Sequence, residues 1–268
     1  MKIQTEQDML EFCGTVKDNF SITICPNMPP LSTQLWYEIN KEMISTGAVG
    51  KGSHLQQGIF EIDRATTGNV VLYEVPKLYP SAKVLAEYPD FVGPITGVLV
   101  NCYDPKTKSF LFHMRGKDVS TPFAFQAAAA GMGIYGQHPS VTAALELQQE
   151  TGLENFRQFP GNGIALGIFP FMKAGKIPQP LFSFGFFDDL SRFHVERSLE
   201  EVIEFESEVK KDIQNQRIHG VEAHHFAIPH RYVERVVGEL DELNRFYGPI
   251  YDSTTNFVRT LKDNHYLE

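Results

Sequence analysis

One segment constrains this chain more than any other: residues 131–153, GMGIYGQHPSVTAALELQQETGL. Pro139 stands where helices favour proline, in the first turn, and Gly152 stands where a glycine commonly ends a helix. The pattern therefore predicts a loop followed by a helix over residues 139–151.

Three polar side chains share one face of that predicted helix. Glu146, Gln149 and Glu150 have the i, i+3 and i+4 spacing of neighbours on a helical surface. Carboxylate and amide oxygens are ligands that Mg²⁺ accepts, and diphosphate hydrolysis requires neutralised phosphate charges. Taken alone, such a group is more often an ordinary solvated face. The residues expected to face the core are Val141, Ala144 and Leu147.

The segment resembles the Nudix box, G-x5-E-x7-R-E-U-x-E-E-x-G-U, in which U is aliphatic. The match has no gaps, and three positions depart from it. Gln137 replaces the first Glu, Leu145 replaces the Arg, and Gln149 replaces a metal-binding Glu. The resemblance implies a Nudix-type α/β/α sandwich, in which helices flank a mixed sheet. The matching residues are Gly131, Glu146, Leu147, Glu150, Gly152 and Leu153.

The resemblance also implies roles for individual residues. Glu146 and Glu150 are the expected catalytic residues, acting through Mg²⁺ or Mn²⁺, and both are expected to bind the metal together with Gln149. Arg115 follows a predicted strand at a position where Nudix proteins often carry a substrate-facing arginine, and Gly131 is expected beside the substrate. A surface cation at the end of the strand explains Arg115 equally well.

Two functions are compatible with this box. The first is metal-dependent hydrolysis of a nucleoside diphosphate linked to another moiety, with a weakened site and a base from outside the box. The second is a catalytically inactive Nudix module that binds a nucleotide or a protein partner. The residues before the box, FQAAAAGMGIYG, are weakly similar to the Nudix subgroup that accompanies thiamine pyrophosphokinase, in which an extension precedes the Nudix domain.

The organisation predicted for the chain follows that similarity. Residues 1–90 are expected to form an α+β extension, and residues 91–268 the Nudix-like domain. Hydrophobic periodicity predicts the individual elements. The helices are expected at 32–46, 139–151, 196–215 and 231–246, the strands at 58–64, 69–75, 95–103, 109–114, 164–172, 180–187 and 222–228, and a connector at 76–94.

Charge and hydrophobicity limit the kinds of partner expected for this chain. The net charge of −9, without a basic block, argues against binding a nucleic acid polymer, so a small diphosphate is the expected ligand. The chain has no apolar run of about 18 residues and no signal-peptide pattern at its start, so no membrane association is expected. Three cysteines without CxxC spacing favour a reducing, cytoplasmic location. A homodimer is compatible with the sequence.

Other titratable groups have ordinary explanations. His224 and His225 are adjacent, so on a strand they point to opposite faces and cannot both bind one metal. Structural histidines are therefore favoured over a zinc site. The glutamates of residues 196–208 and Glu222 could supply a downstream base, although a solvated helix face is the commoner role of such a run.

Overall fold

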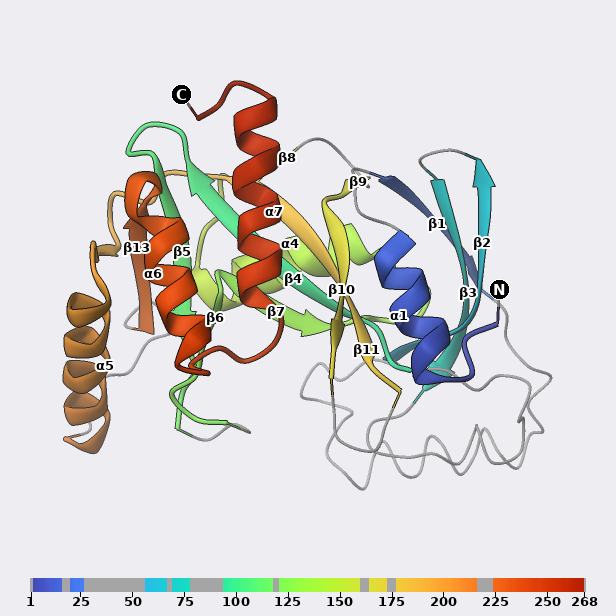
Figure 1. Cartoon of the computed structure of the whole chain (residues 1–268), viewed down its shortest axis with the longest axis horizontal. Helices are drawn as coiled ribbons and strands as arrows, with labels where there is room; N and C mark the ends of the chain where they lie inside the picture. Colours follow the sequence, from blue (N-terminus) through green and yellow to red (C-terminus); the bar gives the residue numbers. More distant parts are fainter. Residues whose placement is uncertain are drawn as a thin grey trace.

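The computed structural model describes residues 2–15, 20–26, 56–66, 69–77, 94–117, 121–159, 164–172, 177–215 and 224–267 (Figure 1). Within these ranges the chain is an α/β protein with a large mixed sheet, as expected. The helices are α1 (Glu6–Thr15), α4 (Pro139–Thr151), α5 (Leu199–Gln214), α6 (His230–Glu242) and α7 (Ile250–Asp263). The strands are β1 (Phe20–Pro26), β2 (Gln56–Thr66), β3 (Asn69–Lys77), β4 (Gly97–Asp104), β5 (Ser109–Met114), β6 (Phe125–Ala127), β7 (Ala129–Met132), β8 (Arg157–Phe159), β9 (Ile164–Ala165), β10 (Gly167–Phe171), β11 (Gln179–Phe187), β12 (His194–Val195) and β13 (His225–Pro229).

The large sheet is built around β4. Its strand order is β10-β11-β4-β5-β13-β12, and β6, β7 and β8 pair with β5, β4 and β11. Strand β4 runs parallel to β11 and antiparallel to β5 and β7. The sheet is therefore mixed, and its central strand has neighbours on both sides along its length.

Every residue of β4 is buried, so both faces of the sheet must be covered. Val100 and Cys102 belong to the same hydrophobic cluster as Leu147 of α4. Leu99, which points to the opposite face, belongs to a second cluster with Phe257 of α7. In Figure 1, α4 lies behind the sheet, and α6 and α7 lie in front of it.

A second, smaller sheet contains the amino-terminal strands in the order β2-β3-β1-β9. Strand β1 pairs parallel with β3 and antiparallel with β9, which the chain reaches only at Ile164. Side chains of the amino-terminal region, including Phe12 and Leu72, lie in the same hydrophobic cluster as Val100. The expected domain boundary near residue 90 stays a prediction. The predicted helix 32–46 and most of the connector 76–94 lie outside the described residues.

The predicted helix over 139–151 is confirmed, but one of its expected core residues is wrong. Leu147 is fully buried, as expected, whereas Ala144 is only half-buried and Val141 is 46% exposed. Ala143 is buried instead. Ala143 and Leu147 are four residues apart and face the sheet together, which turns Val141, two residues before Ala143, away from it.

The end of the chain differs from the expectation of a final helix over 231–246. Helix α6 ends at Glu242, and a further helix, α7, follows and covers β4. Three polar residues, Ser253, Thr254 and Thr260, are among its buried residues. Ser253 Oγ accepts a hydrogen bond of 2.9 Å from Asn101 Nδ2 on β4. The sequence pattern hid this helix because part of its buried face is polar.

The predicted strand over 164–172 is divided. Its first part is β9 in the small sheet and its second part is β10 in the large sheet, with a break at Leu166. The Leu166 amide donates to the Ser183 carbonyl oxygen, and the Leu166 carbonyl oxygen accepts from Asn256 of α7. One segment therefore contributes a strand to each sheet.

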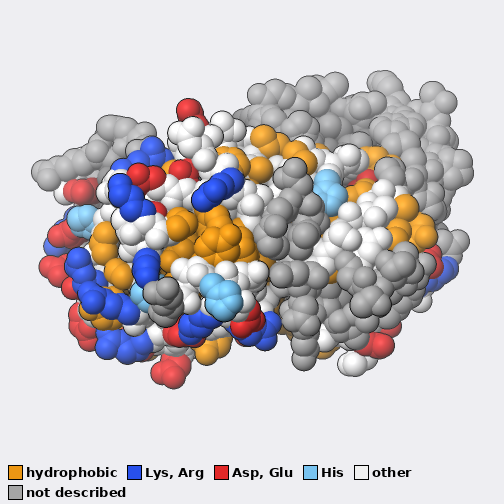
Figure 2. Space-filling view, turned by 90° about the horizontal axis from the view of Figure 1, so that it is seen from above, with side chains coloured by type: hydrophobic (Ala, Val, Ile, Leu, Met, Phe, Trp, Pro, Cys, Tyr) orange, Lys and Arg blue, Asp and Glu red, His pale blue; other side chains and the backbone are white. Residues whose placement is uncertain are grey.

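The surface carries charges of both signs. On the face shown in Figure 2, Lys and Arg side chains are interspersed with Asp and Glu around a group of hydrophobic side chains. Among the helices that the structure describes, none is both long and apolar enough to span a membrane.

Phe257 tests the position of α7. Its ring is fully buried and meets Phe110 edge-on at a centroid distance of 5.9 Å. Phe257→Ala is expected to lower the free energy of unfolding by about 3–5 kcal/mol, because it opens a cavity in the core. Lys262→Ala on the exposed face of α7 is the control and should cost at most about 1 kcal/mol. Chemical denaturation measures both, and similar costs would contradict the burial of α7.

Candidate functional site

The candidate site lies where α4 packs against β7. A side chain at Gly131 of β7 would collide with Glu146, since an added Cβ would stand 2.0 Å from Glu146 Oε1. The carboxyl group of Glu146 therefore occupies the space that the missing side chain leaves. Gly131 and Glu146, which are both box positions, form a single contact between the strand and the helix.

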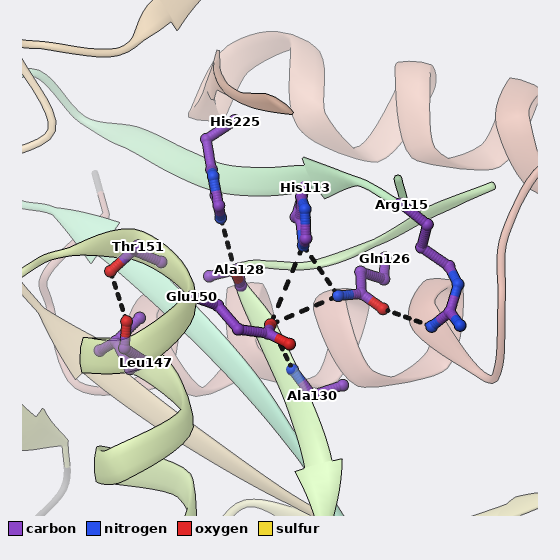
Figure 3. Close-up of polar contacts among 9 residues, drawn as sticks. All are labelled: His113, Arg115, Gln126, Ala128, Ala130, Leu147, Glu150, Thr151 and His225. Carbon is purple, nitrogen blue, oxygen red and sulfur yellow. Dashed lines mark hydrogen bonds and ion pairs between the residues drawn. The ribbon is translucent and has the colours of Figure 1, made fainter. Parts of the chain in front are cut away.

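Glu150 lies one turn further along α4 and points to the same strand (Figure 3). Its Oε2 accepts hydrogen bonds from the Ala130 amide at 3.2 Å and from Gln126 Nε2 at 3.4 Å. His113 Nδ1 lies 3.9 Å from the same oxygen. Strands β5, β6 and β7 thus each present a polar atom to this carboxyl group.

Gln126 links Glu150 to the predicted substrate cation, Arg115. The Arg115 guanidinium donates to Gln126 Oε1 at 3.1 Å, which directs the Gln126 amide nitrogen towards Glu150 and His113. The guanidinium also lies over the Tyr247 ring, 3.9 Å from its centroid. Arg115 is therefore held by contacts with β6 and with the segment between α6 and α7.

The histidines nearest the site are packed in a stack. His113 and His225 occupy opposite positions on β5 and β13, and their rings stack at a centroid distance of 4.3 Å. His225 Nε2 contacts the Ala128 carbonyl oxygen at 3.1 Å, which assigns the proton to that nitrogen. Burial, together with His225, His224 and Arg115, holds the pKa of His113 far below its usual range. His113 is therefore neutral and accepts from Gln126.

Both carboxyl groups have raised pKa values. Burial raises the pKa of Glu146 to about 7. Burial and the nearby charge of Glu146 raise the pKa of Glu150 to about 8, against the opposing effects of the Ala130 amide and Arg115. Two poorly solvated carboxyl groups that repel each other form a place where a cation would be stabilised.

A pocket of about 260 Å³ is lined by Ala130 and Gly131, the residues of β7 that contact Glu150 and Glu146, although neither carboxyl group lines it. Arg115, Ala130 and Gly131 line it together with the aromatic rings of Phe171 and Tyr247. The Phe171 and Tyr247 rings meet edge-on at 4.9 Å. The structure thus brings Arg115 and Gly131, the two predicted substrate-binding residues, to one cavity.

Other predicted residues lie further from this arrangement. Gln149 is exposed on α4, so its role as a metal ligand stays a prediction. Leu145, at the arginine position of the box, is 37% exposed. Within the described ranges, no three His, Cys, Asp or Glu side chains gather as a ready metal cluster. Glu206 of α5 is buried and pairs with Lys210 and Arg245, while Glu222 lies outside the described residues.

Gln126 and Tyr247 were not anticipated as site residues. Gln126 is 3% exposed and lies within the run FAFQAAAA, where one amide interrupts apolar residues. A polar group in such a run has to find a partner when it is buried, and that was a readable signal. Tyr247 follows the end of α6 and carried no comparable signal.

Comparison with known proteins identifies no relative of this chain. No protein-family model matches this chain, and no curated protein is significantly similar to it. The similarity to the Nudix box therefore depends on the box residues themselves and on the positions that they take in the structure.

Removal of one carboxyl group should change how stability depends on pH. In the unfolded chain both groups ionise near pH 4.5, whereas the folded protein holds their protons up to about pH 7 and 8. The free energy of unfolding of the metal-free protein is therefore expected to fall as the pH rises from about 4.5 to 8. In Glu150→Gln this fall should be smaller. The loss of melting temperature between pH 4.5 and 8 should then be a few degrees less than in the wild-type protein.

Melting curves of both forms in chelator, from pH 4.5 to 9, provide the measurement. Comparison of the two forms removes the contribution of other buried acids, such as Glu74 and Asp252, whose pKa values are also raised. Parallel pH profiles would show that Glu150 is as well solvated in the folded protein as in the unfolded chain.

Gly131→Ala should separate metal binding from stability. The added methyl group meets the flexible end of Glu146, so the carboxyl group is displaced while the backbone keeps its place. We expect the melting temperature to change little and Mn²⁺ affinity to fall about tenfold, as when a ligand loses its support. Gly116→Ala is the control, because an added Cβ there meets nothing within 4 Å. Isothermal titration with Mn²⁺ measures the affinity of each variant. An unchanged affinity in Gly131→Ala would show that Mn²⁺ does not bind at Glu146.

Proposed function

We propose that this chain is a Nudix-type, metal-dependent hydrolase of a nucleoside diphosphate linked to another moiety. One observation carries the proposal: Glu146 and Glu150 converge from one face of α4 on Gly131 and Ala130 of β7, and these two strand residues line a pocket with Arg115. The arrangement of helices on both faces of a mixed sheet supports the Nudix-type α/β/α sandwich.

The donor set suits a hard divalent cation. Mg²⁺ and Mn²⁺ prefer oxygen ligands, and Mg²⁺ commonly uses one or two protein carboxylates while it keeps several waters. Glu146 and Glu150 would hold it, and Gln149 could add an amide oxygen from the same helix. A bound cation would neutralise phosphate charge and activate water for hydrolysis.

Residues around the carboxyl groups would prepare the site for this cation. The Ala130 amide and Gln126 both donate to Glu150 Oε2, so they favour its ionised form and fix its direction. Because Gln126 is itself held by Arg115, the side chain that would contact phosphate also positions a metal ligand. His113 is neutral and adds no competing charge.

The pocket indicates how the rest of a substrate would be placed. Arg115 lines this cavity, and its guanidinium would bind a phosphate oxygen there. Phe171, Leu181 and Tyr247 offer an apolar wall for the group attached to the diphosphate. The diphosphate and the group attached to it would therefore both contact this cavity.

Glu150→Gln tests the proposed reaction. With one of two carboxylates lost, turnover of a diphosphate should fall on the order of a thousandfold. The measurement is formation of the two phosphomonoester products from a library of diphosphate compounds, detected as phosphate after treatment with an added phosphatase, with and without Mg²⁺ and Mn²⁺. Glu154→Gln is the matched control, because Glu154 is exposed just beyond α4, and this variant should retain full activity.

Two outcomes would overturn the proposal. Full activity of Glu150→Gln would exclude a role for the metal at this carboxylate. A wild-type protein that binds a diphosphate compound but hydrolyses none would instead be the inactive Nudix module considered from the sequence.

A further inference from the structure

Strands β1, β2 and β3 each contact one loop, residues 133–138, which joins β7 to the start of α4. The loop lies between the two parts of the candidate site, with Gly131 before it and the helix that carries Glu146 after it. Its contacts with β1, β2 and β3 come from residues more than 55 positions earlier in the chain. They are independent of the contacts described for Glu146 and Glu150.

Gln57 of β2 holds the beginning of the loop. Its backbone amide donates to the Gly133 carbonyl oxygen at 2.8 Å, and its side-chain oxygen accepts from Thr96 Oγ1 at 2.7 Å. The Gly133 amide donates to the Thr96 carbonyl oxygen at 3.0 Å. An added Cβ at Gly133 would stand 1.9 Å from Thr96 Oγ1, so only glycine fits in this contact.

Glu74 of β3 holds the middle of the loop. One carboxyl oxygen accepts from the Gly136 amide at 2.9 Å, and the other accepts from Gln57 Nε2 at 2.6 Å. Gly136 has a φ of +75°, so the backbone turns there in a conformation that side chains disfavour. The Glu74 side chain is fully buried, and both of its oxygens are used in this contact.

His138, the last residue of the loop, contacts β1. Its Nε2 lies 3.1 Å from the Ile22 carbonyl oxygen, so that nitrogen carries the proton. The other ring nitrogen, Nδ1, accepts from the Ser140 amide and caps the first turn of α4. The start of the helix is thereby tied to the amino-terminal sheet through one imidazole ring.

We propose that the amino-terminal sheet positions the helix of the candidate site, with Glu74 as its principal positioning residue. One oxygen of Glu74 accepts from the Gly136 amide, and Gln57 holds the other, so the side chain keeps its direction towards the turn. If this contact is lost, the turn at Gly136 is free to relax, and the first turn of α4 relaxes with it. Glu146 would then lose its fixed place against Gly131.

Two substitutions of Glu74 distinguish a positioning role from simple packing. In Glu74→Gln one oxygen remains for the Gly136 amide, and the new amide can donate to Gln57 once the Gln57 side chain flips. Thr96 Oγ1 can accept from the flipped Gln57, since a hydroxyl both donates and accepts. Glu74→Gln should therefore preserve the loop. Glu74→Leu, which keeps much of the volume, removes both acceptors.

Hydrogen–deuterium exchange of the full chain in chelator is the first test. The amides to follow are Val141 and Thr142, which both donate to the His138 carbonyl oxygen at the start of α4. In Glu74→Leu their exchange should accelerate at least about tenfold relative to the amides of α6, and in Glu74→Gln less than about twofold. Glu61→Gln on β2 is the matched control and should leave the rates unchanged.

Mn²⁺ titration of the same four proteins is the second test, at a temperature at which each is folded. This part depends on the proposed function. Affinity should fall about tenfold in Glu74→Leu and stay within about twofold in Glu74→Gln and Glu61→Gln. A wild-type chain that binds no Mn²⁺ would count against the proposed function alone, because the exchange experiment needs no metal.

The inference would be overturned by a Glu74→Leu protein with a lower melting temperature but wild-type exchange at Val141 and Thr142. It would also be overturned if Glu74→Gln accelerated this exchange as much as Glu74→Leu does. In the first case Glu74 would be a packing residue only, and in the second the negative charge itself would stabilise the fold.

Discussion

The burial of strand β4 on both faces is the constraint on which the other parts of the structure depend. A strand that alternates Val98, Val100 and Cys102 with Leu99 and Tyr103 has no face for water, so helices must cover it on both sides. Helix α4 meets this requirement on one side, and α7 on the other. The candidate site arises because the covering helix α4 also carries acidic residues at its edge.

Charge and burial conflict at this edge. The site places two carboxyl groups where water is limited, and their raised pKa values record the resulting cost. The neighbours that offset this cost, the Ala130 amide and Gln126, come from strands rather than from the box helix. In this chain the box position that Leu145 occupies faces solvent, so the carboxyl groups depend on support from other elements.

The sequence predicted the helix of the box, its two carboxylates and most of the long strands, because each has a local signal. Pro139 and Gly152 mark the ends of that helix, and a period of 3.6 or 2 marks the others. What the sequence left open depends on contacts between distant residues. Val141 was misplaced because a short helix with few apolar residues does not define its own buried face. The run around Gln126 signals a buried polar group, but the partners of Gln126 and of Ser253 lie far away in the sequence and could not be predicted from it.

The division of residues 164–171 between two sheets has a consequence for the order in which this protein can fold. Strand β1 pairs with β9, so Phe20 meets Ala165 only after some 145 further residues have been synthesised. During translation the amino-terminal strands therefore leave the ribosome long before one of their partners exists. Their exposed edges and apolar residues, such as Ile22 and Leu72, must be protected during that interval. The same connection that unites the two sheets in the finished protein thus leaves the nascent chain open to association with other chains or with chaperones.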